Sequence, residues 1–142
     1  MKKTKLLFVS LFVILFFNNT LFSKTDYFLQ GKKLFLEKNF DKSKLKFEKD
    51  IVFNPKNEKS YLYLAKIFKE KKNDKFEEQN LNTVILLNPK NEEALYLLTL
   101  LKIKQSDYQK TVKLIETFKK VCTSFCKKES ELNKKLKNLE PQ

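Results

Sequence analysis

Apolar side chains recur at intervals of three and four residues from Tyr27 onward, which is the spacing of one buried helical face. Asn39 interrupts the pattern, so we predict one helix on each side of it. The apolar face of the first helix begins with Tyr27, Gly31, Leu34 and Leu36. The face of the second contains Phe40, Ser43, Phe47 and Ile51. The pattern predicts an all-α fold of short amphipathic helices.

The pattern repeats along the chain with a period of thirty-four residues. The tetrapeptide Asn-Pro-Lys-Asn occupies residues 54–57 and returns at residues 88–91. The same displacement aligns large residues with large ones and small residues with small ones: Tyr27, Tyr61 and Leu95; Gln30, Leu64 and Leu98; Gly31, Ala65 and Thr99; Phe47, Leu81 and Ile115. It also aligns Leu34, Phe68 and Lys102, in which the lysine is the exception. Repeats of this length are typical of helical arrays, so we predict three units, 24–57, 58–91 and 92–125.

Each unit boundary combines the end of one helix with the start of the next. Pro55 and Pro89 lack the backbone N–H that a continuing helix needs, so each ends a second helix. Asn57 and Asn91 follow at the expected N-cap positions, and acidic residues come directly after them.

The repeat resembles the tetratricopeptide repeat (TPR), a resemblance that covers residues 24–125. It rests on the period and on four features, namely small residues in the first helix (Gly31, Ala65), an aromatic opening the second (Phe40, Tyr108), a small residue three positions on (Ser43, Thr111), and the closing prolines Pro55 and Pro89. The resemblance implies an α-solenoid of three helix pairs.

Two units depart from the TPR pattern. Asp74 and Glu77 stand where an aromatic and a small residue are expected, so the second helix of unit two is predicted to be shifted or loosely packed, with Phe76 as the substitute aromatic. The third unit carries Thr123 in place of its proline.

The tail, residues 126–142, carries Leu132, Leu136 and Leu139 on one helical face and lysines elsewhere. A solenoid needs a terminal element with one polar face, so we predict a capping helix. The alternative is a basic amphipathic helix that lies on anionic lipid.

The first twenty-three residues have the pattern of a signal peptide, with Lys2, Lys3 and Lys5 before an apolar run from Leu6 to Phe17. That run is too short to span a bilayer comfortably. Cleavage after Ser23 is predicted, and an uncleaved anchor or a buried helix remain alternatives. Export to the periplasm or cell envelope follows from the first interpretation.

Composition excludes most enzymatic chemistry. The chain has no histidine and one glycine, so it lacks the residues for a Ser-His or Cys-His nucleophile, an imidazole metal site or a glycine-rich phosphate loop. The neighbouring carboxylates Glu77-Glu78 and Glu92-Glu93 point about 100° apart on a helix and form no acid–base pair. We predict a protein without catalytic residues, cofactor or metal.

The formal net charge is +13, and all thirty basic residues are lysines. Nucleic acid is the usual partner of such a chain. The absence of arginine, the lack of a dense basic tract and the predicted export argue against it. The lysines mostly alternate with acids, as on a solvated helix face.

Cys122 and Cys126 are the only cysteines. An exported chain with an even number of cysteines favours a disulfide, and free buried thiols or a redox pair are the alternatives. The C-x-x-x-C spacing differs from that of thioredoxin-like sites.

The TPR resemblance implies a partner-binding groove, because the first helix of each TPR lines a concave surface that binds peptides or helices. Carried over by register, this surface contains Phe28, Lys32, Phe35, Leu62, Lys66, Lys69, Tyr96, Leu100 and Ile103. The alternative is that Phe28, Phe35 and Leu62 pack against neighbouring helices. The carboxylate clamp known in the family is not reproduced, since Phe28, Tyr63 and Glu93 replace its polar or basic residues.

These features together predict a non-catalytic adaptor of a bacterial cell envelope, which binds a protein or peptide partner, acidic in character, in a basic and aromatic groove. The competing hypothesis is a peripheral membrane protein that binds anionic lipid through its lysines and C-terminal helix.

Overall fold

The computed structural model describes residues 26–139, which form α-helices, one 3-10 helix and no strand. The helices are α2 (Tyr27–Leu36), α3 (Phe40–Phe53), α4 (Glu58–Glu70), α5 (Asp74–Leu87), α6 (Glu92–Lys104), α7 (Tyr108–Val121), the 3-10 helix η1 (Cys126–Lys128) and α8 (Glu129–Lys137). The predicted signal peptide and the last three residues of the tail lie outside the described part. Within it, no helix combines the length and apolar content needed to cross a membrane.

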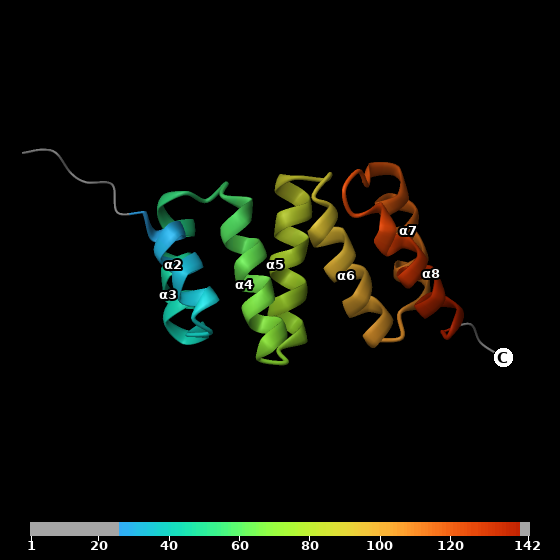
Figure 1. Cartoon of the computed structure of the whole chain (residues 1–142), viewed down its shortest axis with the longest axis horizontal. Helices are drawn as coiled ribbons and strands as arrows, with labels where there is room; N and C mark the ends of the chain where they lie inside the picture. Colours follow the sequence, from blue (N-terminus) through green and yellow to red (C-terminus); the bar gives the residue numbers. More distant parts are fainter. Residues whose placement is uncertain (1–25, 140–142) are drawn as a thin grey trace, which may run out of the picture.

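The helices form antiparallel pairs that stack side by side along one axis, giving an elongated solenoid (Figure 1). The second helices α3, α5 and α7 begin at residues 40, 74 and 108, so the thirty-four-residue period is kept in space. The prediction that α5 is shifted is therefore wrong. Phe76 stacks on Phe68 of α4, with 5.1 Å between the ring centroids, while Glu77 is buried at the crossing.

The turns repeat as closely as the helices do. Lys38, Lys72 and Ser106, each thirty-four residues from the next, end the first helices in the left-handed conformation, with φ of 57°, 54° and 57°. Asn91 caps α6 as predicted, since its side chain accepts a hydrogen bond from the Ala94 N–H at 2.9 Å. Asn57 makes no such bond, because its amide nitrogen donates to the buried carboxylate of Asp50 at 2.6 Å.

Three hydrophobic clusters along the solenoid form the core. They centre on Phe47, Leu64 and Ile67 in the first half, on the contacts of α4, α5 and α6 in the middle, and on Ile115, Phe118 and Leu132 at the C-terminal end. Leu36, predicted to lie on a buried face, is 71% exposed, because it occupies a position at the end of the first helix that faces solvent in every repeat, where Glu70 and Lys104 are exposed as well.

Gly31 allows the close approach of α2 and α3. A Cβ atom at this position would lie 2.8 Å from the buried ring of Phe47. Ser43 of α3 donates a hydrogen bond to the Gly31 carbonyl oxygen at 2.8 Å, which fixes the crossing. In the next unit the equivalent positions hold a larger residue on the first helix and a smaller one on the second, Ala65 and Leu81.

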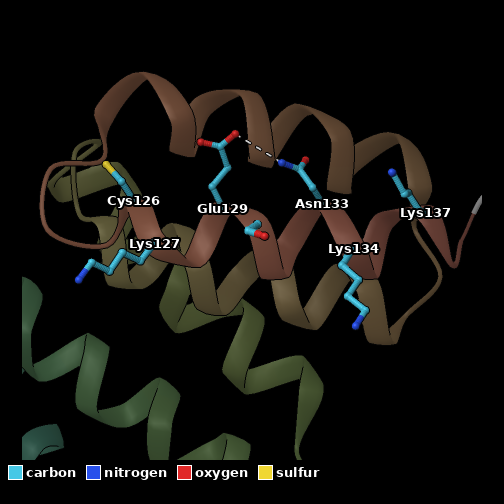
Figure 2. Close-up of a pocket in the computed structure, with 7 residues that line it drawn as sticks. Cys126, Lys127, Glu129, Asn133, Lys134 and Lys137 are labelled. Carbon is cyan, nitrogen blue, oxygen red and sulfur yellow. Dashed lines mark hydrogen bonds between the residues drawn. The ribbon is translucent and has the colours of Figure 1, made fainter.

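The tail forms a cap in which α8 takes the place of a fourth first helix. Leu132 follows Leu98 by thirty-four residues, like Leu98 after Leu64, and it is completely buried against α6 and α7. The opposite side of α8 is polar and borders an open depression of about 550 Å³ (Figure 2). Because Leu132 is buried and Leu136 packs beside it, the arrangement favours the capping helix over the lipid-binding alternative for the tail.

Candidate partner-binding face

The residues predicted to line the groove lie on the same side of the first helices, at positions four and three residues apart. We call this side the first-helix face. On each helix these residues point toward the next first helix along the stack. Phe28 contacts Tyr63 of α4, Lys66 pairs with Glu93 of α6, and Tyr96 bonds to Glu131 of α8. The predicted set therefore follows the seams between successive first helices.

Aromatic rings dominate the first seam. Tyr63 lies at its centre, with ring-centroid distances of 5.8 Å to Phe28, 5.1 Å to Phe35 and 5.0 Å to Phe47. The two phenylalanines of α2 meet the Tyr63 ring edge-on, while Phe47 stacks beneath it. Phe28, Phe35 and Tyr63 remain partly exposed, so they offer apolar surface while being fixed by their contacts.

Charged groups border this aromatic cluster. The Lys66 ammonium lies 5.0 Å from the Tyr63 ring centroid and 2.7 Å from the Glu93 carboxylate. Lys32 and Lys69 are exposed and form no ion pair among the described residues. The free positive charge of the first-helix face therefore comes from Lys32 and Lys69, while that of Lys66 is already compensated.

Leu62 is the exception among the predicted residues. It is only 7% exposed and packs in the core with Ala65, Leu81 and Leu98. Its position corresponds to those of Phe28 and Tyr96, whose larger aromatic side chains remain partly exposed. Its side chain is therefore part of the core. Phe28 and Phe35 also pack against neighbouring helices, as the alternative expected, although both remain partly exposed.

Tyr96, Leu100 and Ile103 are half-buried and pack toward α7 and α8. The Tyr96 hydroxyl lies 3.1 Å from each carboxylate oxygen of Glu131, and Lys128 lies 5.4 Å over its ring. Burial and the bond to Glu131 raise the pKa of Tyr96, which keeps its hydroxyl protonated. The cap thus covers much of this end of the first-helix face.

Tyr63 and Glu93 were not among the residues predicted to line the groove. Tyr63 follows Leu62 by one residue and Glu93 precedes Tyr96 by three, and each contacts the preceding first helix, through Phe28 and Lys66 respectively. Successive residues are rotated by about 100° around the helix axis, so a shift of one residue moves a side chain from one flank to another. The sequence indicated Tyr63 only through the presence of aromatic residues at similar levels along adjacent first helices. The stacking of these helices is what brings the aromatic side chains into contact.

The predicted cysteine pair lies at the C-terminal end of the solenoid, outside the first-helix face. Cys122 caps α7 and Cys126 begins η1, and the structure pairs them with their Cα atoms 5.2 Å apart, within the usual range of a disulfide. The intervening loop is held by Glu92, whose carboxylate accepts bonds from Thr123, Ser124 and Phe125. These bonds lower the pKa of Glu92 to about 2.

Lys102, the exception in the aligned repeats, is buried on the opposite side of α6. Its ammonium lies 2.6 Å from the Glu78 carboxylate and donates to the Gln105 side-chain oxygen at 2.8 Å. A buried charge requires such partners. The bond from Lys102 lowers the pKa of Glu78 and keeps the pair ionised. The depression of about 350 Å³ beside this pair is therefore lined by a charge that is already satisfied.

The sequence matches no protein-family model and no curated protein. Solved structures do match. The TPR2B domain of yeast Sti1, solved in a complex with pHsp70, superimposes with a TM-score of 0.72 at 14% identity, over 79% of this chain and 94% of that chain. This chain has the TPR fold.

Two further TPR domains give similar superpositions. The first TPR of Spaghetti (RPAP3), bound to the HSP90 peptide SRMEEVD, matches with a TM-score of 0.71 and 18% identity over 80% of this chain and 90% of that one. The Sgt2 TPR domain from Aspergillus fumigatus matches with a TM-score of 0.67 and 14% identity, over 82% and 83%. At these identities the likeness defines the fold, and the side chains of the first-helix face are this protein's own.

Proposed function

We propose that the protein is a non-catalytic adaptor of a bacterial cell envelope that binds a partner peptide or helix on its first-helix face. The observation that carries the proposal is the half-exposed aromatic cluster around Tyr63, bordered by Lys32 and Lys69, which lack ion-pair partners among the described residues. Two of the structural neighbours were solved with partner molecules, pHsp70 and an HSP90 peptide, which supports a binding role for the fold.

The chemistry of the face specifies the partner. Aromatic rings that are fixed by packing offer apolar anchoring at little cost in side-chain entropy. Lysine ammonium groups beside them favour negative charge on the ligand and exclude a basic one. The partner segment is therefore one that carries an apolar side chain next to acidic residues.

Recognition of a terminal carboxylate is not part of this proposal. The positions that would form a carboxylate clamp hold Phe28, Tyr63 and Glu93, and Glu93 is itself an acid paired with Lys66. A carboxylate placed there would meet an aromatic surface and a like charge. The adaptor therefore binds an internal segment of its partner, in an envelope location that rests on the signal-like sequence of residues 1–23.

A displayed library of random peptides, selected on the chain of residues 24–142, tests the proposal. We expect selected peptides to combine an aromatic or aliphatic residue with acidic neighbours. A fluorescent peptide from the selection should bind Lys32→Glu/Lys69→Glu at least about tenfold more weakly than the unchanged protein, because both free charges are reversed.

The matched control is Lys42→Glu/Lys75→Glu, which changes the net charge equally but alters exposed lysines on the second helices. This control should retain its affinity within about twofold. Equal weakening of both variants, or a selection without acidic peptides, would contradict the proposed face. Circular dichroism of each variant confirms that the helices are intact.

A further inference from the structure

The depression of about 350 Å³ beside Lys102 lies between three helices, α5, α6 and α7. Its apolar lining consists of Leu98 and Leu114, and its charged lining includes Glu78, Lys102, Lys110 and Lys113. The first-helix face contains none of these residues. The depression is therefore a second candidate site, independent of the proposed adaptor function.

The repeat explains why space is left at this place. One unit earlier, Phe68 and Phe76 occupy the positions equivalent to Lys102 and Lys110, thirty-four residues before each. Their rings stack at the crossing of α4 and α5, with 5.1 Å between the centroids. At the crossing of α6 and α7, lysines stand in place of both rings, and their ammonium groups pair with carboxylates. The depression therefore lies where the preceding repeat holds a stacked aromatic pair.

The bottom of the depression is apolar although the aromatic pair is missing. Leu98 is only 4% exposed and belongs to the middle core cluster, while Leu114 packs against that cluster and remains partly exposed. An apolar group that enters the depression removes water from these side chains, which is favourable. The volume of about 350 Å³ lies at the lower end of the range of small-molecule sites, about 300–1,000 Å³.

The charges around the leucines favour an anion. Lys102 lies 2.6 Å from Glu78, so these two charges compensate each other. Lys110 lies 3.7 Å from Asp107, but its side chain is 62% exposed and can also contact a ligand. Lys113 is exposed and forms no ion pair among the described residues. Three lysines thus face two carboxylates, and the uncompensated charge is that of Lys113.

We propose that this depression binds a small aromatic carboxylate. The ring of the ligand lies on Leu98 and Leu114, in the place that the aromatic pair takes one repeat earlier. The carboxylate of the ligand faces Lys113 and Lys110, whose ammonium groups favour an anion over a neutral molecule of the same shape. A flat ring supplies a large apolar surface and loses little conformational entropy on binding.

The test uses the chain of residues 24–142, since all three core clusters lie within residues 26–139. The probes are 2-naphthoate and its neutral counterpart 2-naphthamide, which differ in charge and hardly in shape. Methyl resonances of isotope-labelled leucines report the place of binding, because an aromatic ring shifts the resonances of the methyl groups it touches. Naphthoate should shift the methyl groups of Leu98 and Leu114 with a common Kd below about 5 mM. It should leave those of Leu45, exposed on α3, unchanged.

Charge recognition is tested by comparing the two probes in two variants. The unchanged protein should bind naphthoate at least about fivefold more tightly than naphthamide. In Lys110→Gln/Lys113→Gln this preference should fall below about twofold, because the charges beside the carboxylate are gone. Lys42→Gln/Lys75→Gln is the matched control, which removes two exposed lysines outside the depression and should keep the preference. Circular dichroism confirms that both variants remain helical.

Three results would overturn the proposal. The first is no shift at the methyl groups of Leu98 and Leu114, and the second is an equal shift at Leu45, which would show unspecific binding to exposed leucines. The third is equal affinity of the unchanged protein for the acid and the amide. An equal loss of preference in both variants would also contradict the proposal, because net charge and not the lining of the depression would then select the anion.

Discussion

The carboxylate of Glu92 accepts a hydrogen bond from the backbone N–H of Phe125, with 2.7 Å between Oε2 and N. The two residues are the first and last of the third repeat as the period divides the chain. Glu58 opens the second repeat and bonds to Asn88 near the end of it in a similar way. The acidic residue that starts a first helix therefore also fixes the turn that closes the same repeat, which keeps the stack in register.

Replacing Glu92 by glutamine should make the third repeat and its cap less stable, with an effect that depends on pH. The folded-state pKa of about 2 lies below the ordinary value of 4.5, so the carboxylate stabilises the fold fully above about pH 4.5. This contribution is lost as the pH falls toward 2. Melting temperatures measured by circular dichroism between pH 7 and pH 2.5 should differ most at neutral pH and converge in acid. A difference that stays constant over this range would contradict the role of the charge.

Gly31→Ala should destabilise the protein by about 1 kcal/mol net. The added methyl group overlaps the ring of Phe47, and overpacking of this kind costs about 1–3 kcal/mol, which exceeds the gain of nearly 1 kcal/mol from replacing a helical glycine. In a Phe47→Leu background the same change should be neutral or stabilising, because Ala65 and Leu81 form that pairing one repeat later. Urea denaturation of the four proteins gives the coupling between the two positions. Additive effects would show that the two residues do not restrict each other.

Glu77→Gln should stabilise the protein at neutral pH by roughly 1 kcal/mol, since it removes a poorly solvated buried charge. Burial raises the pKa of Glu77 above 4.5, although Lys69 acts in the opposite direction. The folded protein therefore holds this proton more tightly than the unfolded chain, and stability falls as the pH rises from 4.5 through the raised value. The advantage of the glutamine variant should be largest at pH 7 and disappear below about pH 4. An equal advantage at both ends of this range would point to packing and not to charge.

Reduction of the Cys122–Cys126 pair should lower the free energy of unfolding by about 2 kcal/mol, the value expected for closing a five-residue loop. Intact-mass analysis after alkylation without reductant should show no labelled thiol in protein purified under oxidising conditions. Cys122→Ser/Cys126→Ser should match the reduced protein in stability. Complete alkylation, together with equal stability before and after reduction, would show that the two thiols are free.

The period of the sequence was enough to predict the solenoid, because the turn prolines, the capping asparagines and the small residues at the helix crossings all recur at the same interval. Unit two shows why local pattern alone was misleading. Glu77 and Asp74 break the expected residue types, yet α5 keeps its register, because Leu81 and Val84 are completely buried and hold the helix in place. Tertiary packing outweighed the unfavourable residues.

The candidate face was harder to predict than the fold. Which flank of a first helix remains open depends on its neighbours, so equivalent positions have different fates: Phe28 is partly exposed, Leu62 is enclosed, and Tyr96 is bonded to the cap. The pairing of Lys66 with Glu93 joins residues from different repeats. Such contacts follow from the stacking geometry and leave no trace in the spacing of one repeat.

Photo-cross-linking in cells that produce the full chain tests the central proposal most directly. A photoreactive amino acid at Lys69 lies beside the aromatic cluster on the first-helix face, and the same group at Lys113 lies on a second helix as the control. We predict one discrete cross-linked partner from position 69 in the envelope fraction, absent from position 113 and competed by the peptide selected on the isolated chain. The same cross-linked species from both positions, or none from position 69, would contradict binding on the first-helix face.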